Sequence, residues 1–337
     1  MVAGSEGVQE GEDMRKDVQY FLLCAVVLLF LPGCPPQDSD NPPGDYRTEM
    51  RALVEAVSAY AKSIKPSFLI VPHNAESLLT VDGAPTSLPS IAYINSIDGQ
   101  AREDVFYGYI EDDSATPPPE RDAILAMLDW AEAQGIQVLV IDHCSTCSRV
   151  DTSYDWNAGR GYVSTATCRD SNAIPSYPPQ PYRANANDVQ SLAHAQNLLH
   201  FLDPCQYGTC PSYLWALGVS NFDLLVIDSC FAGQMLTPQQ VESLKTKSNG
   251  GKRLVLAYLN IGEAETHRYY WRSSWQPGSP SWLDEQHPGS GRYLVHYWDY
   301  DWQALLFGSP NAYLNQILAA GFDGVYLDGV EAYQHFE

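Results

Sequence analysis

Carboxylates stand directly after short apolar runs at four places in this sequence, an arrangement that can serve acid–base chemistry. The apolar residues 254–260 are followed by Glu263, and three other apolar runs end in Asp142, Asp228 and Asp328. Parallel strands of one sheet share their carboxyl ends, so these side chains should converge on one face of the fold. Four unrelated surface carboxylates are the alternative, which the repetition of the pattern disfavours.

The runs themselves are typical of parallel strands buried on both faces. Residues 221–228 and 321–328 share the order small residue, Phe, Asp, apolar run, Asp, and residues 135–142 are a looser copy. Such runs fit strands covered by helices on one side and a barrel interior on the other. The aromatic residues 269–271 come soon after Glu263 and favour a site that faces sugars. A buried strand followed by an ordinary charged loop is the alternative.

The elements that must position these carboxylates predict an α/β fold, a single (β/α)8 TIM barrel. Strands are expected at residues 68–74, 135–142, 161–167, 221–228, 254–260, 293–298 and 321–328, with a weaker one at 97–103 that periodicity alone does not define. Helices are expected at 45–65, 120–134, 188–202 and 302–320, and from Thr237, where Pro238 and Gln240 complete a capping pattern. Residues 143–160 are expected to form a polar loop.

Charge excludes one class of partner. The chain carries 19 basic and 41 acidic residues, a formal net charge of −22. Such a surface repels nucleic acid and other anionic polymers and attracts cationic ones. Acidity that serves only solubility is the alternative.

The first residues resemble an export leader. Met14 is the expected true start, because it opens a basic segment before the apolar residues 20–31, which are too short to span a bilayer. The segment ends in Leu-Pro-Gly-Cys34, which resembles a bacterial lipobox, so lipidation of Cys34 is expected. An uncleaved membrane anchor is the alternative.

This interpretation divides the chain into a leader at 1–34, a flexible tether at 35–45 and one barrel at 46–337. The expected product is an exported bacterial lipoprotein, facing the periplasm or anchored at the cell surface. It would be a monomer that touches the membrane only through its lipid.

Export changes what the cysteines imply. Six remain after Cys24 and Cys34, and an oxidising compartment predicts at least one disulfide among them, with Cys205 and Cys210 the favoured pair. Cys144 and Cys147 could form half a zinc site or a redox pair. The sequence has no second CxxC and no HxxxH, so neither a metal nor a cofactor is expected.

Several motifs resemble glycoside hydrolase family 114, extracellular glycosidases related to endo-α-1,4-polygalactosaminidases. They are the segments 258–265, 282–284, 297–299, 302–303 and 321–328 together with 68–76, 97–99, 103–108 and 187–192. The resemblance covers most of residues 46–337 and implies a TIM barrel. It also implies endo-acting hydrolysis, in the family's manner, of an extracellular amino-sugar polysaccharide that can be cationic and rich in galactosamine.

The order of the motifs departs from that family. There the strand equivalent to 221–228 is followed by the equivalent of 321–328 and only then by the equivalent of 68–74, whereas here 68–74 comes first. The resemblance therefore implies a circularly permuted barrel. It predicts that strand 68–74 lies parallel and next to strand 321–328.

The resemblance assigns catalysis to Asp328 and Glu103. Glycoside hydrolysis normally needs two carboxyl groups, one to protonate the leaving oxygen and one to attack or to activate water. The expected roles are general acid/base for Glu103 and nucleophile, or its electrostatic equivalent, for Asp328. Glu331 stands where the family usually has Asp and is an expected substrate contact.

The other expected substrate-binding residues line the same pocket: Asn74, Asp142, Asp228 and Glu263 for hydroxyl or amino groups, and Tyr258 and Trp298 for stacking on sugar rings. Core packing is the alternative for Trp298, and a hydrogen-bonded rim carboxylate is the alternative for Asp142 and Asp228. Arg268 and His267 are expected to support carboxylates.

Two rival functions stay open on the sequence alone. One is a metal-dependent carbohydrate esterase or deacetylase that uses the same carboxylates, which the lack of clustered histidine ligands disfavours. The other is a surface lipoprotein that binds sugar without cleaving it.

Overall fold

The computed structural model describes residues 44–287 and 290–337. The expected leader, the lipidation of Cys34 and nearly all of the tether lie outside the described residues. Within the described part, no helix is both long enough and apolar enough to cross a membrane.

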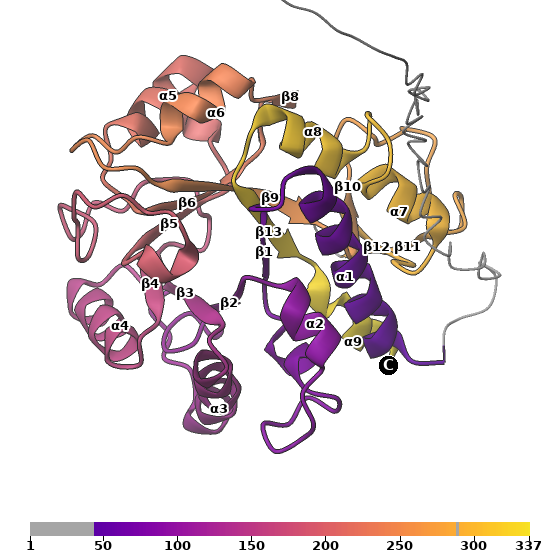
Figure 1. Ribbon diagram of the computed structural model, residues 1–337, viewed down its shortest axis with the longest axis horizontal. Coiled ribbons are helices and arrows are strands. Elements are labelled where there is room, and N and C mark those ends of the chain that lie inside the picture. Colours follow the sequence, from indigo (N-terminus) through magenta and orange to yellow (C-terminus); the bar gives the residue numbers. More distant parts are fainter. Residues whose placement is uncertain (1–43, 288–289) are drawn as a thin grey trace, which may run out of the picture. The chain divides into compact units, whose positions relative to one another are not determined.

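Two parallel sheets form the centre of the fold (Figure 1). The larger has the spatial order β1-β13-β9-β6-β5, and the smaller has the order β2-β3-β4. Their bounds are β1 Leu69–Pro72, β2 Gly99–Glu103, β3 Gln137–His143, β4 Val163–Thr167, β5 Leu198–Phe201, β6 Leu224–Asp228, β9 Leu254–Asn260 and β13 Gly324–Asp328. A single parallel bridge, His73 to Ala101, joins β1 to β2. The strand pairing leaves β4 and β5 in separate sheets, so it does not define a closed barrel.

Helices and short strands surround these sheets. The helices are α1 Tyr46–Ile64, α2 Ile91–Ser96, α3 Pro118–Ala133, α4 Cys147–Gly159, α5 Cys210–Gly218, α6 Pro238–Leu244, α7 Tyr300–Leu306, α8 Tyr313–Ala320 and α9 Tyr333–Phe336. The capping pattern predicted at Thr237 is confirmed, because its side chain accepts from the Gln240 N–H and the Gln240 side chain accepts in return from the Thr237 N–H. Two short antiparallel sheets complete the fold, β7 Cys230–Phe231 with β8 Gln234–Met235, and β10 Glu263–Glu265, β12 Arg292–Val295 and β11 Leu283–Gln286.

Alternation along the strands decides which side chains face the site. On β13, Val325 and Leu327 belong to the large core shared with the helices, whereas Tyr326 belongs to a separate inner cluster with Tyr258 of β9. Successive side chains of a strand point to opposite faces. Asp328 therefore shares the inner face with Tyr326, at the carboxyl end of its strand.

Two predicted elements are wrong. Residues 188–202, whose apolar spacing suits a helix, form a short 3₁₀ turn at Leu192–His194 and then strand β5. Residues 293–298 contribute β12, which pairs antiparallel with β10 and β11 and is no strand of the parallel sheets. In the first case burial against neighbours distant in sequence overrides the local spacing, whereas in the second the predicted strand forms but pairs outside the parallel sheets.

Two further expectations need smaller corrections. Residues 147–159 of the expected polar loop form helix α4. The expected helix at 302–320 is two helices, α7 and α8, interrupted at residues 307–312, which include Gly308 and Pro310. Gly308 has a φ of +98°, a conformation that ends a helix readily.

The predicted neighbour of the first strand is confirmed. β1 pairs in parallel with β13, with Leu69 opposite Gly324 and Pro72 opposite Leu327. Since β1 also meets β2 through the His73 bridge, Glu103 and Asp328 end strands that lie two apart.

The expected disulfide does not form. The six cysteines of the described residues are all free thiols, Cys205 and Cys210 among them. Cys210 opens α5 and its Sγ accepts a hydrogen bond from Gln240 Nε2 of α6, while Cys205 lies exposed in a 3₁₀ turn. The two side chains are therefore committed to different surroundings.

Candidate active site

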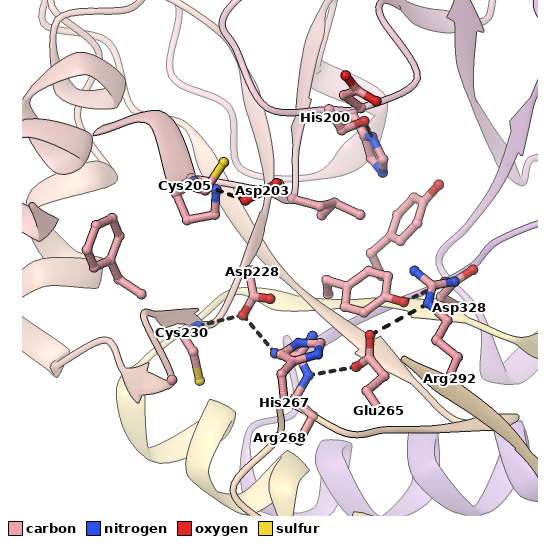
Figure 2. Close-up of a pocket in the computed structure, with 18 of the residues that line it drawn as sticks. His200, Asp203, Cys205, Asp228, Cys230, Glu265, His267, Arg268, Arg292 and Asp328 are labelled. Carbon is pink, nitrogen blue, oxygen red and sulfur yellow. Dashed lines mark hydrogen bonds and ion pairs between the residues drawn. The ribbon is translucent and has the colours of Figure 1, made fainter. Parts of the chain in front are cut away.

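A cavity of about 1020 Å³ opens where the parallel strands end. Five of the expected catalytic and substrate-binding residues line it: Glu103, Asp228, Tyr258, Asp328 and Glu331. Figure 2 shows Asp328, Asp228 and the neighbouring arginines pointing toward one another around it.

Asp328 contacts three polar side chains of the cavity, those of His73, Tyr258 and Arg292. Its Oδ1 is 3.0 Å from His73 Nδ1, and its Oδ2 accepts a hydrogen bond of 2.6 Å from the Tyr258 hydroxyl. Arg292 Nη1 lies 3.6 Å from the same Oδ2. Burial opposes ionisation, but the hydrogen bond and charge of His73, with the charge of Arg292, hold the pKa of the Asp328 carboxyl below its usual range. The side chain is therefore an anion in the neutral pH range.

Glu103 approaches the same imidazole from β2. Its Oε2 is 3.8 Å from His73 Nε2, and its Oε1 accepts a 3.1 Å hydrogen bond from Asn74 Nδ2. Burial would raise the pKa of the Glu103 carboxyl, but the charges of His73 and His143 and the hydrogen bond from Asn74 together outweigh it, and the pKa is lowered. Asn74 thus binds a carboxylate of the site, although it is not among the residues that line the cavity.

His73 connects the two carboxylates. It directly follows β1, which lies between β13 and β2, and its side chain is 8% exposed. Burial alone would lower its pKa, but Glu103 and Asp328 raise the pKa of His73 to about 9. The ring is therefore an imidazolium at neutral pH, with a nitrogen directed at each carboxylate.

Glu331 is the one carboxyl group of this set with a raised pKa. It follows Asp328 by three residues, in a 3₁₀ turn at Val330–Ala332, and its Oε2 is buried with no hydrogen-bond partner among the described residues. Burial and the charge of Asp328 raise the pKa of Glu331 to about 7. It can therefore hold a proton beside an ionised aspartate.

Arg268 pairs with two further carboxylates of the cavity, those of Asp228 and Glu265. Arg268 donates to Glu265 Oε2 at 2.6 Å and to Asp228 Oδ1 at 2.9 Å, and it lies over the rings of Tyr258 and Tyr313. This confirms the expectation that Arg268 supports carboxylates. Because the pairs are almost fully buried, they hold the wall in one geometry.

Three other expected contacts lie away from the cavity lining. Asp142 is fully buried and accepts hydrogen bonds from Phe106 N, Tyr107 N, Ser153 and Asn157. Glu263 accepts from Asn260 Nδ2 at 3.0 Å and pairs with His287 and Arg292. Trp298 packs against Tyr46, His296 and Phe336. These contacts match the structural alternatives for Asp142 and Trp298.

The sequence interpretation missed His73, Glu265, Arg292 and His200 as site residues. His73 precedes Asn74 at the end of a predicted strand, so its position near the site follows from the sequence, but an isolated histidine without metal-ligand spacing gives no signal of its carboxylate partners. His200 was missed because residues 188–202 were predicted to form a helix, whereas His200 lies on strand β5. Arg292 reaches the site from β12, which the sequence placed in the barrel.

The donor set offers no evident metal site. Within residues 44–287 and 290–337, no group of three or more His, Cys, Asp and Glu side chains is placed to hold a metal ion. The ionised carboxylates and the His73 imidazolium can perform proton transfer and nucleophilic attack.

Comparison with known families supports a glycosidase relation. Residues 214–337 match the model of glycoside-hydrolase family GH114, which confirms the resemblance for this part of the chain. The matched part contains Asp228, Tyr258, Asp328 and Glu331, whereas Glu103 and His73 lie before it.

Curated relatives match over similar lengths. An uncharacterized protein of Methanocaldococcus jannaschii is 33% identical over 153 residues, 45% of this chain and 42% of the relative. Uncharacterized proteins of Thermotoga maritima and Deinococcus radiodurans are 35% identical over 118 residues and 37% identical over 123 residues. These two matches span 35% and 36% of this chain and 35% and 37% of the relatives. The matches thus span less than half the length of each relative.

Proposed function

We propose that this protein is a glycoside hydrolase that cleaves an extracellular amino-sugar polysaccharide with Asp328 and Glu103 as its carboxylate pair. The observation that carries the proposal is the imidazole of His73, which faces both carboxylates at the carboxyl ends of parallel strands. Glycosidases place two carboxyl groups on either side of the bond that breaks. The cavity volume of about 1020 Å³ leaves room for more than one sugar ring.

The two carboxylates take different roles in this scheme. Asp328 is held ionised and attacks the anomeric carbon, or stabilises positive charge there, while the bond to the leaving oxygen breaks. Glu103 is ionised at neutral pH, so the proton that it passes to that oxygen comes first from the His73 imidazolium, whose Nε2 lies 3.8 Å away. This leaves Glu103 as a carboxylate and His73 neutral, ready to take back the proton that Glu103 removes from the attacking water. Water then completes the hydrolysis with Glu103 as base.

An amino-sugar substrate suits the charge of the cavity. Seven carboxylate side chains line it, against three arginines and the His73 imidazolium. Asp170 and Asp203 are exposed on its rim and form no ion pair with any described residue. A cationic, partly deacetylated galactosamine polymer would be drawn toward such a surface, and salt would weaken the attraction.

We also propose that the chain is a circularly permuted (β/α)8 barrel. The family match begins only at residue 214, as expected when motif order changes before that point. Arg47 of α1 pairs with Glu337 at 3.3 Å, so these two segments lie next to each other. A chain rearranged to begin at Thr209, with Glu337 linked to Gly44, should fold and keep its activity; aggregation of that chain would count against the proposal.

Export as a Cys34-lipidated, monomeric lipoprotein remains part of the proposal. Mass spectrometry of membrane-extracted protein should find an acylated N-terminus at Cys34, and Cys34→Ala should release the protein from the membrane. A mature N-terminus elsewhere would refute this part alone.

The hydrolysis is tested with reducing-end assays on partially deacetylated galactosamine polymers. Glu103→Gln and Asp328→Asn should each lose about 10²–10⁴-fold in turnover, while Asp122→Asn on exposed α3 keeps full activity. Undiminished cleavage in both variants would refute the assignment. Activity abolished by chelation and restored by a divalent metal would favour an esterase or deacetylase, and binding without any cleavage would favour a sugar-binding lipoprotein.

A further inference from the structure

His200 is a buried polar residue of the cavity that the proposed chemistry does not use. It lies on the inner face of β5, is 7% exposed and lines the same cavity as Asp328. Its Nδ1 is 3.0 Å from the Ser171 hydroxyl, which sets the orientation of the ring, and its Nε2 has no hydrogen-bond partner among the described residues. In Figure 2 the ring of His200 extends from its strand toward the cavity.

Tyr326 is a second buried polar residue that lines the same cavity. It is 1% exposed, and its hydroxyl is also buried without a hydrogen-bond partner in the described residues. Its ring lies 5.4 Å from that of His200 and stacks 5.1 Å from that of His73. Buried polar groups almost always have a partner, so two unpartnered groups beside one cavity indicate that a polar group binds between them.

The protonation states of His200 and Tyr326 restrict which polar group can bind between them. Burial and the repulsion of charged His73 lower the pKa of His200 to about 3, so its ring is neutral. Burial also raises the pKa of the Tyr326 hydroxyl well above its usual value. Both groups are neutral, and the neighbouring His73, Glu103 and Asp328 carry charges of both signs, so the hydrogen-bonding capacity of the two atoms selects the group that binds. A hydroxyl can both donate and accept, so it suits either tautomer of His200.

The positions of Tyr326 and Asp328 on β13 relate the two unpartnered groups to the bond that would break. Tyr326 precedes Asp328 by two residues on the same face of β13, which places it about 6–7 Å further back along the strand. A sugar whose anomeric carbon lies at Asp328 would therefore direct a ring substituent toward Tyr326 and His200.

We propose that His200 and Tyr326 form a subsite that binds a free hydroxyl of the sugar ring held at Asp328. This inference rests on the proposed glycosidase function and adds a specificity to it. The subsite accepts a hydroxyl of the bound ring.

The test combines variants with substrate analogues. The full-length protein is titrated calorimetrically with galactosamine oligosaccharides and with analogues in which one hydroxyl is replaced by hydrogen, and cleavage is followed in parallel. Tyr326→Phe and His200→Phe should each weaken binding and kcat/KM by about 10- to 100-fold, because a buried substrate hydroxyl loses its partner. One deoxy analogue should lose a similar factor with the wild type and little more with either variant.

Tyr326→Phe removes a single oxygen atom, so it remains informative if His200→Phe fails to fold. The subsite is wrong if this variant binds and cleaves like the wild type, or if each deoxy analogue loses the same factor in both proteins. In that case cleavage by the wild type still supports the glycosidase. Binding that both variants weaken, without cleavage by the wild type, supports the subsite and overturns hydrolysis. No binding by the wild type overturns both.

Discussion

Replacing His73 by Gln tests the charged link between the two carboxylates. The side chain is 8% exposed and lies 3.0 Å from Asp328 and 3.8 Å from Glu103, so the substitution removes a buried positive charge and keeps a polar group. Burial lowers the pKa of His73, but the carboxylates raise it to about 9 from an ordinary value of 6.5. The stability of the protein should therefore depend on pH through this residue.

The size of the effect follows from the shift. Each pKa unit is worth about 1.4 kcal/mol, so the change between the unfolded and the folded protein amounts to about 3 kcal/mol. Because the folded pKa is the higher one, this stability is fully present below pH 6.5 and is lost as the pH rises through 9. The same interaction lowers the pKa of Asp328, so the two contributions are not added.

Urea unfolding between pH 6 and pH 10 measures this directly. The free energy of unfolding of the wild type should exceed that of His73→Gln by an amount that shrinks by about 3 kcal/mol across this range. His200→Gln is the matched control, because His200 is buried in the same cavity but has its pKa lowered to about 3. Its difference from the wild type should stay constant above about pH 7.5, where histidine is neutral in both states. A constant difference for His73→Gln as well would refute the imidazolium.

Three further substitutions probe other parts of the fold and site. Lys247→Met should cost about 3–5 kcal/mol of unfolding free energy, because it leaves the buried Asp223 carboxylate without its cation. In the wild type, Asp223 Oδ1 lies 2.7 Å from Lys247 Nζ in a fully buried pair. Gly262→Ala should cost about 3 kcal/mol, the upper end of the usual overpacking penalty, because the new methyl meets the backbone oxygen of Gly329. Glu331→Gln should flatten the pH dependence of stability between about pH 4.5 and pH 7, since the raised pKa gives Glu331 a contribution that is present below 4.5 and lost as the pH rises through 7.

Matched controls accompany these three measurements, all by urea unfolding. Lys252→Met changes an exposed lysine near Lys247, and Gly159→Ala adds a methyl that meets no atom within 4 Å. Glu285→Gln removes an exposed carboxyl whose side chain is 66% accessible. Equal losses in a variant and its control would contradict the stated cause in each case.

Much of the central architecture was predictable because continuous burial leaves a strong pattern. A strand covered on both faces must be apolar along its length, so β3, β6, β9 and β13 were predicted close to their observed bounds. The carboxylates that end them follow directly from those bounds. Strand β5, only four residues long, was not predicted, because Leu192, Ala195 and Leu199 also have the spacing of a helix face.

The sequence by itself determined that carboxylates stand at strand ends and that Asp328 and Glu103 belong together through resemblance. Only the tertiary structure decided which of them face the cavity. Asp142 and Asp328 end similar runs, yet Asp142 is enclosed by four hydrogen-bond donors from nearby loops and α4, whereas Asp328 faces the cavity. His73 carries its charge because strands that end 30 and 255 residues later bring Glu103 and Asp328 to it. A pKa depends on distances between groups and on their burial, and a linear pattern contains neither.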